Sequence, residues 1–454
     1  MIKFRKFYFI FILSVIVPLE AFGNVTSFSL ENGMRVVVVE DHRAPVVTHM
    51  VWYRAGASDE NSGKSGIAHL LEHLLFKETE NVENGEFSKT VAALGGSDNA
   101  FTSQDYTAYY QRVSKQYLDL MMYYESDRMK NLKISELDFN TEVKVVIEER
   151  SQRTDSKPGA LFNEQNMASL YLNHPYGVPI VGWRHELDDL VLEDAIDFYK
   201  TYYSPNNAIL IVSGDVDPKN VQILANKFYG SLENTIYLDV RKRPAEPPQI
   251  VERRLIFEDE RVSQPYITRT YLAAERDLGQ QREAAALTLL ADLIGSDGIQ
   301  SILGKTLQLD NKKAIYTNAY YNGLSYDDTN FSLIVVPNND VTLLDIEAEL
   351  DKVINTFISK GIDEDHLERI KFQYKAQQIY SLDSAYSQAR RFGVALTSGL
   401  TIEDVLAWPK TIQDIKSAEI LAAAISLFKK ESSVTGWIRK PFEELSLIHI
   451  SEPT

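Results

Sequence analysis

The sequence predicts an α+β protein of two homologous α/β-sandwich domains, each a mixed or antiparallel sheet with helices packed on it. The chain has 454 residues, too many for one ordinary core, and 44% hydrophobic with 24% charged residues is a globular composition. β-Branched runs bounded by turn residues alternate with segments of helical periodicity. The order strand, helix, strands, helices and final strand occurs twice, so we expect a duplicated unit.

The N-terminal segment 1–23 is expected to be a cleaved signal peptide. Lys3, Arg5 and Lys6 precede a long apolar run, which ends at residues 21–23 with small residues where signal peptidase cleaves. An uncleaved anchor is the alternative, but the run is short for a membrane span of about 20 residues. The expected location is therefore periplasmic or secreted, without stable membrane insertion after cleavage.

Charge and cysteine content exclude several classes of protein. The formal net charge is −17, and removing residues 1–23, which carry +3 and −1, leaves −17 − 2 = −19. This negative charge argues against nucleic acid or an anionic membrane as the main partner. The chain has no cysteine, so it has neither disulfides nor a cysteine nucleophile nor thiolate metal ligands.

The first domain is expected over residues 24–238. Strands are expected at 34–41, 46–56, 99–113 and 207–217, and helices at 65–78, 116–132, 139–153, 192–203 and 218–232. The segment 241–254 holds three prolines and many charges, which predicts a linker, placed at 239–252.

The second domain is expected over residues 253–445. Strands are expected at 265–274, 313–323, 329–337 and 432–440, with a helix at 282–295 and long helices before the last strand. The final residues, 446–454, continue no element and are typical of a non-native tail.

The stretch GIAHLLEHLLFKETE, residues 66–80, predicts a metal site. His69 and His73 are four residues apart and lie on one face of a helix, flanked by Glu72. Leucines surround them, which predicts a buried helix. Burying these groups costs several kcal/mol unless they are paired or bind a metal. A salt-bridged core is the alternative. Zinc would need a third protein ligand, a carboxylate or another histidine.

The stretch TEVKVVIEERSQR, residues 141–153, supplies that ligand. Glu142 and Glu149 are seven residues apart, nearly two helical turns, and so share a face. The apolar residues between them predict that this helix is also buried. We expect Glu149 to bind the metal, Glu142 to orient a ligand or water, and Glu148 to point elsewhere.

Several motifs together resemble a known family. His-Leu-Leu-Glu-His is an inverted zincin motif, and Glu149 follows its second histidine by 76 residues. The chain also contains LGGSDNAFTSQDYTAYY, HPYGVPIVGW and YYSPNNAILIVSGDVD. With these stretches it resembles the pitrilysin-type (M16) zinc metallopeptidases, in particular the short bacterial branch similar to mitochondrial processing peptidase. The resemblance covers residues 28–235 well and the second half mainly in layout.

The resemblance implies an exported zinc-dependent endopeptidase with one Zn²⁺ per chain. It implies that His69, His73 and Glu149 bind the metal. Glu72 would be the general base that activates water, and Glu142 the supporting acid. The second half has no such motif: its matching helix reads TLLADLIGSDG at residues 288–298.

The resemblance also implies how substrate binds. Asn99, Ala100 and Phe101 fall where family members hold a peptide along an edge strand, which requires an extended or unfolded peptide.

A partner subunit is also implied. Family members complete the site with an arginine and a tyrosine, which in the short branch come from a separate subunit. The stretch 317–328 lies near the corresponding place but contains no arginine. The resemblance therefore implies a homodimer or a heterodimer with an M16 homologue.

Two other functions stay open. The chain could be a non-catalytic structural subunit of an M16-type heterodimer. It could instead be a peptide-binding clamp with a structural zinc, although such a zinc would have four protein ligands and the sequence offers three.

Overall fold

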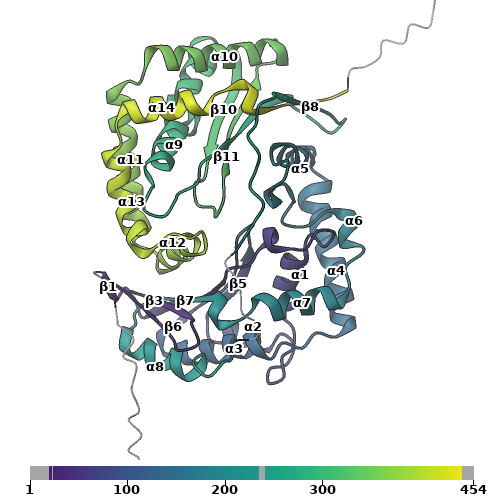
Figure 1. Ribbon diagram of the computed structural model, residues 1–454, viewed down its shortest axis with the longest axis vertical. Coiled ribbons are helices and arrows are strands. Elements are labelled where there is room, and N and C mark those ends of the chain that lie inside the picture. The colour runs from purple at the N-terminus through teal and green to yellow at the C-terminus, as the bar shows by residue number, and fades with distance from the viewer. Residues whose placement is uncertain (1–19, 23, 235–240, 442–454) are drawn as a thin grey trace, which may run out of the picture.

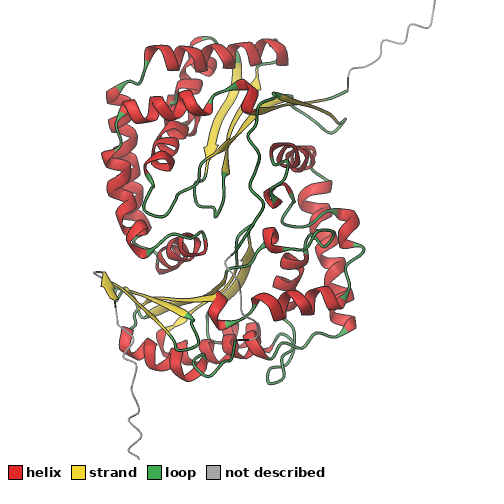
Figure 2. Cartoon of the chain, in the orientation of Figure 1, coloured by secondary structure: helices red, strands yellow, loops and turns green. Residues whose placement is uncertain are grey.

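The computed structural model describes residues 20–22, 24–234 and 241–441 (Figures 1 and 2). Of the expected signal peptide, only residues 20–22 are described, and the expected tail 446–454 lies outside the described residues. The chain folds into two α/β units, each with one mixed sheet and its helices, which confirms the predicted fold class. Among the helices described, none combines the length and apolarity that crossing a membrane requires.

The first sheet has seven strands in the order β1-β2-β3-β7-β4-β6-β5. Its strands are β1 (Glu20–Phe22), β2 (Val25–Ser29), β3 (Arg35–Glu40), β4 (Val46–Tyr53), β5 (Ser97–Thr102), β6 (Thr107–Ser114) and β7 (Ala208–Gly214). Only β3 and β7 run parallel. Strand β5 is the last in the order, so one side of it is a sheet edge.

The second sheet has five strands in the order β10-β11-β9-β12-β8. Its strands are β8 (Arg253–Glu258), β9 (Tyr266–Ala273), β10 (Ala314–Tyr321), β11 (Thr329–Pro337) and β12 (Ser433–Arg439). Only β12 and β8 run parallel. In the order β8-β12-β9-β11-β10, the first pair of strands is parallel and each following pair is antiparallel. The strands β3-β7-β4-β6-β5 of the first sheet have the same order of directions, as expected of a duplicated unit.

Fourteen α-helices are described, eight before the connecting segment and six after it. The first eight are α1 (Ile67–Leu74), α2 (Glu86–Ala93), α3 (Leu118–Lys130), α4 (Glu136–Arg150), α5 (Pro158–Leu170), α6 (Arg184–Leu187), α7 (Leu192–Tyr202) and α8 (Pro218–Phe228). The others are α9 (Arg282–Ala291), α10 (Leu343–Lys360), α11 (Glu364–Ser381), α12 (Ala385–Thr397), α13 (Ile402–Asp414) and α14 (Ser417–Leu427).

Each half has its own apolar core on one face of its sheet. In β4, alternate side chains such as Val47 and Val51 join the core beneath α1, α3 and α7, while Met50 and Trp52 face the other way. The core of the second half lies between its sheet and helices that include α9, α10 and α14.

The opposite face of each sheet is covered by a helix from the other half. Helix α12 packs on β3, β4 and β7 (Figure 1). Its Phe392 and Ala395 share an apolar cluster with Trp52. Helix α5 packs on β8, β9 and β12, where Phe162 meets Ile438. The two halves therefore exchange one helix each and share apolar cores.

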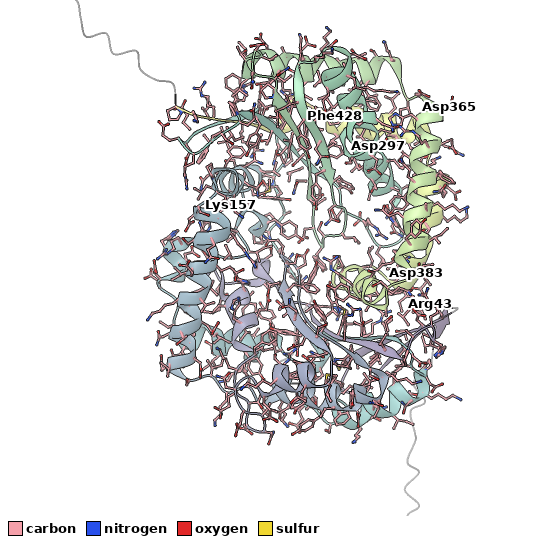
Figure 3. All side chains as sticks on the ribbon, turned by 180° about the vertical axis from the view of Figure 1, so that it is seen from behind. Arg43, Lys157, Asp297, Asp365, Asp383 and Phe428 are labelled. Atoms are coloured by element: carbon pink, nitrogen blue, oxygen red, sulfur yellow. The ribbon has the colours of Figure 1, made fainter. Side chains whose placement is uncertain are left out.

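An ion pair reinforces the contact of α12 with the first sheet. Arg43, in the turn between β3 and β4, lies 2.5 Å from Asp383, in the turn that leads into α12, and also donates to the carbonyl of Leu382 at 2.6 Å. Figure 3 shows Arg43 and Asp383 next to each other at this junction.

One expected strand is in fact a hairpin. The prediction of a single strand at 99–113 is wrong, because residues 103–106 turn the chain between β5 and β6. The Ser103 N–H donates to the carbonyl of Tyr106 at 2.8 Å and closes the turn. Asp105 is buried there against the hydroxyl of Tyr176 at 2.7 Å, so the turn is fixed by tertiary contacts.

Candidate metal centre

The start of α1 is fixed by a glycine and a buried carboxylate. Gly66 has φ +90°, and a Cβ there would lie 2.7 Å from the carbonyl oxygen of Val181, so a side chain would be both strained and crowded. Glu60 accepts from the N–H groups of Gly66 and Ala68 at 3.0 and 2.9 Å. These contacts satisfy free N–H groups of the first turn and set the direction of the helix.

Helix α1 is buried on its apolar sides and open on its polar side. Leu70, Leu71 and Leu74 are fully buried. The side chains of His69 and His73 are 12% and 21% exposed. The predicted burial therefore holds on the apolar sides, and the histidine face is partly exposed to solvent.

Helix α4 presents its acids to α1. Its N-cap residue is Ser135, whose side chain accepts from the N–H of Asp138. Glu142 and Glu149 face α1, and Glu148 is exposed, as the helical spacing predicted. The prediction that this helix is buried holds for one face only, because Val145 is 42% exposed.

Three ligand atoms converge between these helices. Nε2 of His69 lies 3.7 Å from Oε1 of Glu149, and Nε2 of His73 lies 3.5 Å from Oε2. One ligand atom from each of the three residues lies within 4.8 Å of the other two. The structure thus brings together the three residues expected to bind metal.

The separations fit a shared ion better than direct pairing. Distances of 3.5 and 3.7 Å are longer than ordinary N–H···O hydrogen bonds. Ligands about 2.0–2.2 Å from a tetrahedral zinc stand about 3.3–3.6 Å apart. The donor set, two imidazoles and one carboxylate, is the kind that a catalytic zinc site uses with one position left for water. The residues present therefore fit Zn²⁺.

Glu142 and Lys77 hold the second histidine. Oε2 of Glu142 lies 3.3 Å from Nδ1 of His73, and Lys77 Nζ lies 2.6 Å from its other oxygen. With Nδ1 donating to this carboxylate, His73 keeps the lone pair of Nε2 for the ion, which is the usual support of a metal-bound histidine. Glu142 thus lies where it can orient a ligand, as expected.

Glu72 lies beside the cluster and is held by the edge strand. The hydroxyl of Thr102, the last residue of β5, donates to Oε2 of Glu72 at 2.5 Å. Burial raises the pKa of Glu72, although the hydrogen bond from Thr102 opposes the shift. A carboxylate with a raised pKa accepts a proton more readily, as a general base must.

His69 on α1 and Glu149 on α4 have different electrostatic surroundings. Burial, followed by the nearby His73, lowers the pKa of His69 to about 3, so its imidazole is neutral at neutral pH, as metal binding requires. Glu149 also contacts the guanidinium of Arg153, which is 74% exposed. Arg153 therefore lies at the solvent side of the cluster.

The residues expected to bind substrate lie on β5. Asn99 is exposed, Ala100 is 9% exposed and belongs to the core beneath α1, and Phe101 faces the α12 side against Trp52. The side-chain oxygen of Asn99 accepts from the N–H of Ala100 at 2.9 Å. The strand ends at Thr102, so its edge runs toward Glu72.

The second half adds no partner to the cluster. Among the described residues after 241, none makes an ion pair or hydrogen bond with the three metal-facing side chains. The stretch 317–328 instead belongs to β10 and the loop beyond it, in the other sheet.

Three supporting residues were not found from the sequence. Lys77 follows His73 by four residues and Arg153 follows Glu149 by four, so helical spacing could have indicated both. Thr102 directly follows the residues assigned to the edge strand, but its contact with Glu72 depends on the β5–β6 hairpin, which the sequence did not reveal.

The fold and the donor set together define a two-unit α/β protein with a His-His-Glu cluster on two neighbouring helices. The family model "Insulinase (Peptidase family M16)" matches residues 35–183, and "Peptidase M16 inactive domain" matches residues 189–374. A relative from Helicobacter pylori (strain ATCC 700392 / 26695), named "Zinc protease PqqE", is 30% identical over 419 residues, 91% of this chain and 92% of the relative. The chain belongs to peptidase family M16.

Solved structures agree with this assignment. A crystal structure of a protease from Helicobacter pylori has a TM-score of 0.84 and 30% identity, and the alignment covers 94% of this chain and all of that one. The periplasmic protease PqqL from Escherichia coli has a TM-score of 0.78 at 19% identity, with 93% of this chain and 48% of that chain covered. The second similarity shows the shared fold. "Uncharacterized zinc protease YmxG" from Bacillus subtilis (strain 168) is 25% identical over 81% of this chain and 87% of its own length.

Proposed function

We propose that the chain is an exported zinc-dependent endopeptidase that hydrolyses extended or unfolded peptides. The observation that carries the proposal is the convergence of His69, His73 and Glu149, with separations that suit one ion, beside the base-like Glu72. Zinc-protease relatives that cover most of the chain support the same activity.

Residues of the chain transfer the proton and orient a metal ligand. Bound zinc supplies Lewis acidity for the scissile carbonyl and for water. Glu72, positioned by Thr102, accepts a proton from the attacking water and delivers it to the leaving amine. Glu142, fixed by Lys77 at 2.6 Å, keeps His73 oriented.

Substrate is proposed to add a strand along β5. A sheet edge offers unpaired N–H and C=O groups to an extended peptide. Asn99, Ala100 and Phe101 lie on that edge, which ends at Thr102 and therefore at Glu72. A peptide paired with β5 would lead its scissile bond toward the metal centre.

Export and pairing are part of the proposal. The signal-peptide pattern of residues 1–23 supports export, as does the description of the related Escherichia coli protein as periplasmic. The absence of an arginine in 317–328 supports a second M16 chain, in a homodimer or heterodimer, that would contribute an arginine and a tyrosine.

Replacing Glu72 tests the proposal. The variant Glu72→Gln keeps the shape of the side chain but cannot accept the proton, so cleavage of an unstructured peptide should fall by at least about 100-fold. Zinc content should stay near that of the wild type. Glu148→Gln is the matched control, because Glu148 is exposed on α4 beside the metal-facing Glu149. Unchanged cleavage in Glu72→Gln would refute the assigned base.

A second candidate is a non-catalytic subunit of an M16-type heterodimer. The match of residues 189–374 to a family model described as an inactive domain is compatible with it. The two candidates separate when the chain is assayed with and without a candidate partner. A wild-type chain that binds zinc but cleaves no peptide in either case favours the second.

A further inference from the structure

A large cavity lies between the two halves, apart from the metal centre. Its volume is about 1070 Å³, at the upper end of the range for small-molecule sites. Its walls include the segment 57–63 before α1, the connecting segment 241–244, Tyr326, and residues 396–401 at the end of α12 and just after it. Neither the metal-facing residues nor Glu72 lie among these lining residues.

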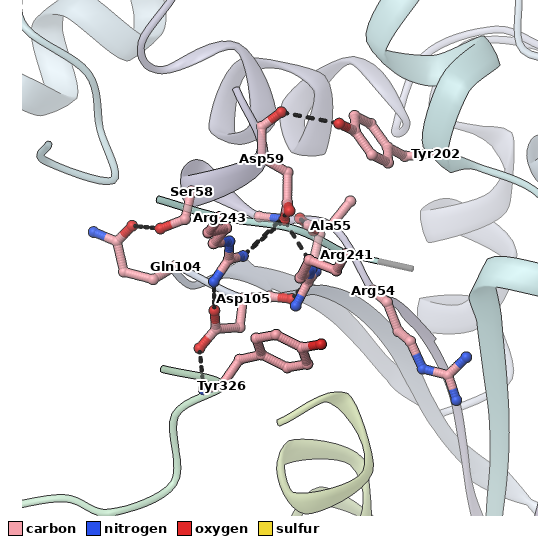
Figure 4. Close-up of polar contacts among 12 residues, drawn as sticks. Arg54, Ala55, Ser58, Asp59, Gln104, Asp105, Tyr202, Arg241, Arg243 and Tyr326 are labelled. Carbon is pink, nitrogen blue, oxygen red and sulfur yellow. Dashed lines mark hydrogen bonds and ion pairs between the residues drawn. The ribbon is translucent and has the colours of Figure 1, made fainter. Parts of the chain in front are cut away.

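Two of the arginines that line this cavity are neutralised by buried acids. Arg243 lies 2.5 Å from Asp105 and 3.2 Å from Asp59. Arg241 lies 3.0 Å from Asp59 (Figure 4). Both guanidinium groups also stack on the ring of Tyr326, at 5.0 Å for Arg241 and 5.6 Å for Arg243. This wall of the cavity is therefore held rigidly.

Arg54 has no such partner. It follows β4, and its half-buried side chain makes no hydrogen bond or ion pair with any residue that the structure describes. In Figure 4 its guanidinium points away from the carboxylate of Asp59. Burial, and then the positive charges of Arg35 and Arg241, lower the pKa of Arg54, while Tyr326 opposes the shift. Among the described residues, the cations that act on Arg54 thus repel it.

The acids of the cavity wall are already engaged. Asp59 is shared by the two paired arginines. Glu60 accepts from the backbone at the start of α1, and Glu186 accepts from the N–H of Ser65 at 2.8 Å. Within the ranges 24–234 and 241–441, the acids of this wall therefore leave Arg54 as an unpaired cation, in a chain with a net charge of −17. A partly buried cation without a counter-charge is costly, and a bound anion would offset that cost.

We propose that this cavity binds an anionic group, a phosphate or a carboxylate, on Arg54, with Arg35 and Arg241 lining the same cavity. The planar guanidinium donates two parallel hydrogen bonds to either group. Two sources share this chemistry: free inorganic phosphate and the C-terminal carboxylate of a peptide. The site does not depend on the proposed peptidase activity, because none of these arginines touches the metal centre.

Binding to the zinc-loaded chain tests the site. Titration calorimetry with inorganic phosphate and with tripolyphosphate should show binding to the wild type that weakens at least about tenfold in Arg54→Gln. Arg184→Gln, an exposed arginine outside the cavity, should bind as the wild type does. Any phosphate bound at the zinc contributes equally to all three proteins. Absence of binding to the wild type, or equal binding to wild type and Arg54→Gln, overturns phosphate as the ligand.

A pair of peptides distinguishes the second source. A short peptide with a free C-terminus, compared with its C-terminal amide, should show an affinity difference that disappears in Arg54→Gln if the ligand is a peptide carboxylate. If neither phosphate, tripolyphosphate nor the free carboxylate depends on Arg54, the proposal is wrong.

Stability without ligand separates this role from a structural one. In phosphate-free buffer, Arg54→Gln should melt at the same temperature as the wild type or higher, because repulsion from Arg35 and Arg241 is removed. Added phosphate should then raise the melting temperature of the wild type more than that of the variant. Arg54→Lys, which keeps the charge, should retain part of this rise. A lower melting temperature of Arg54→Gln in phosphate-free buffer would contradict the site.

Discussion

The two halves share a strand order but differ at one helix. In the first half, α1 between β4 and β5 carries His69, Glu72 and His73. In the second half, α9 between β9 and β10 buries alanines and leucines, including Ala286, Leu289 and Leu290. The fold therefore does not need the metal cluster, and the function belongs to side chains placed on one copy of a repeated scaffold.

The neighbouring helices differ in the same way. Helix α4 turns Glu142 and Glu149 toward α1. Helix α11, which packs near α9, contributes Leu367 and Ile370 to an apolar core instead. At these helices the first copy has partly exposed acids that face histidines, and the second copy places Leu367 and Ile370 in its core.

The largest effect is expected from removing the carboxylate of Glu149. Glu149→Ala should reduce zinc content from about one ion per chain to near zero, because two imidazoles alone bind zinc weakly. Elemental analysis after dialysis measures this loss. Glu368→Ala, an exposed acid on α11 of the second half, should leave zinc content unchanged. Full zinc content in Glu149→Ala would contradict the view that Glu149 makes the first half, and not the second, a metal-binding unit.

A smaller effect is expected at Lys77. Lys77→Met removes the cation that fixes Glu142 and should weaken zinc binding by about 10- to 100-fold, the usual range for residues that support a metal ligand. Competition with a chelator measures the affinity. Lys144→Met, at an exposed position of α4, is the control, and an equal change in both variants would show that general charge, not the contact with Glu142, is responsible.

The exchanged helices α5 and α12 allow a test of whether both pack equally tightly on the sheet of the other half. A Cβ on Gly393 of α12 would lie 2.0 Å from the buried ring of Trp52, and one on Gly436 of β12 would lie 2.1 Å from the ring of Phe162 in α5. Gly393→Ala gains about 1 kcal/mol of helix propensity, but crowding costs about 1–3 kcal/mol.

We therefore expect both Gly393→Ala and Gly436→Ala to lower the free energy of unfolding, measured by urea denaturation. Ser387→Ala, on α12 away from this contact, should change it little. A stabilised Gly393→Ala would mean that α12 does not pack tightly on the first sheet.

The smallest effect concerns Asp292, which directly follows α9 in the second half. Burial, and then Asp297, raise its pKa from 3.8 to about 6. The unfolded chain therefore loses the Asp292 proton at a lower pH than the folded chain does. The contribution of Asp292 to the free energy of unfolding is greatest below pH 3.8 and declines as pH rises toward about 6.

Asp292→Asn should remove this decline and stabilise the protein by on the order of 1 kcal/mol above pH 6. Urea denaturation at several pH values measures the difference. Asp310→Asn, at an exposed position, should follow the wild type. Parallel pH profiles of Asp292→Asn and the wild type would contradict the raised pKa.

Much of the first half could be predicted from local patterns. Helical spacing was enough to place His69 with His73 on one helix face and Glu142 with Glu149 on another, because the period of a helix fixes which side chains share a face. The strands β3, β4 and β7 are nearly all apolar, which gives a clear signal.

The remaining features depend on contacts between distant segments. Helix α5 was not predicted, because it buries Glu164 against Arg150 and Asn166 against Thr270. These polar positions hide its apolar face. The β5–β6 turn is set by Asp105 and its distant partners, and Thr102 reaches Glu72 only once that turn has formed. Local periodicity carries no record of such pairings.

The exchange of α5 and α12 has a consequence for how the chain can be divided. A fragment that ends in the connecting segment would leave Trp52 and its neighbours bare, and the complementary fragment would expose Val434 and Ile438. Each piece would present an uncovered sheet to water and would tend to aggregate. When co-expressed, the pieces could bury these surfaces only against each other, so the two gene halves would function as an obligate pair.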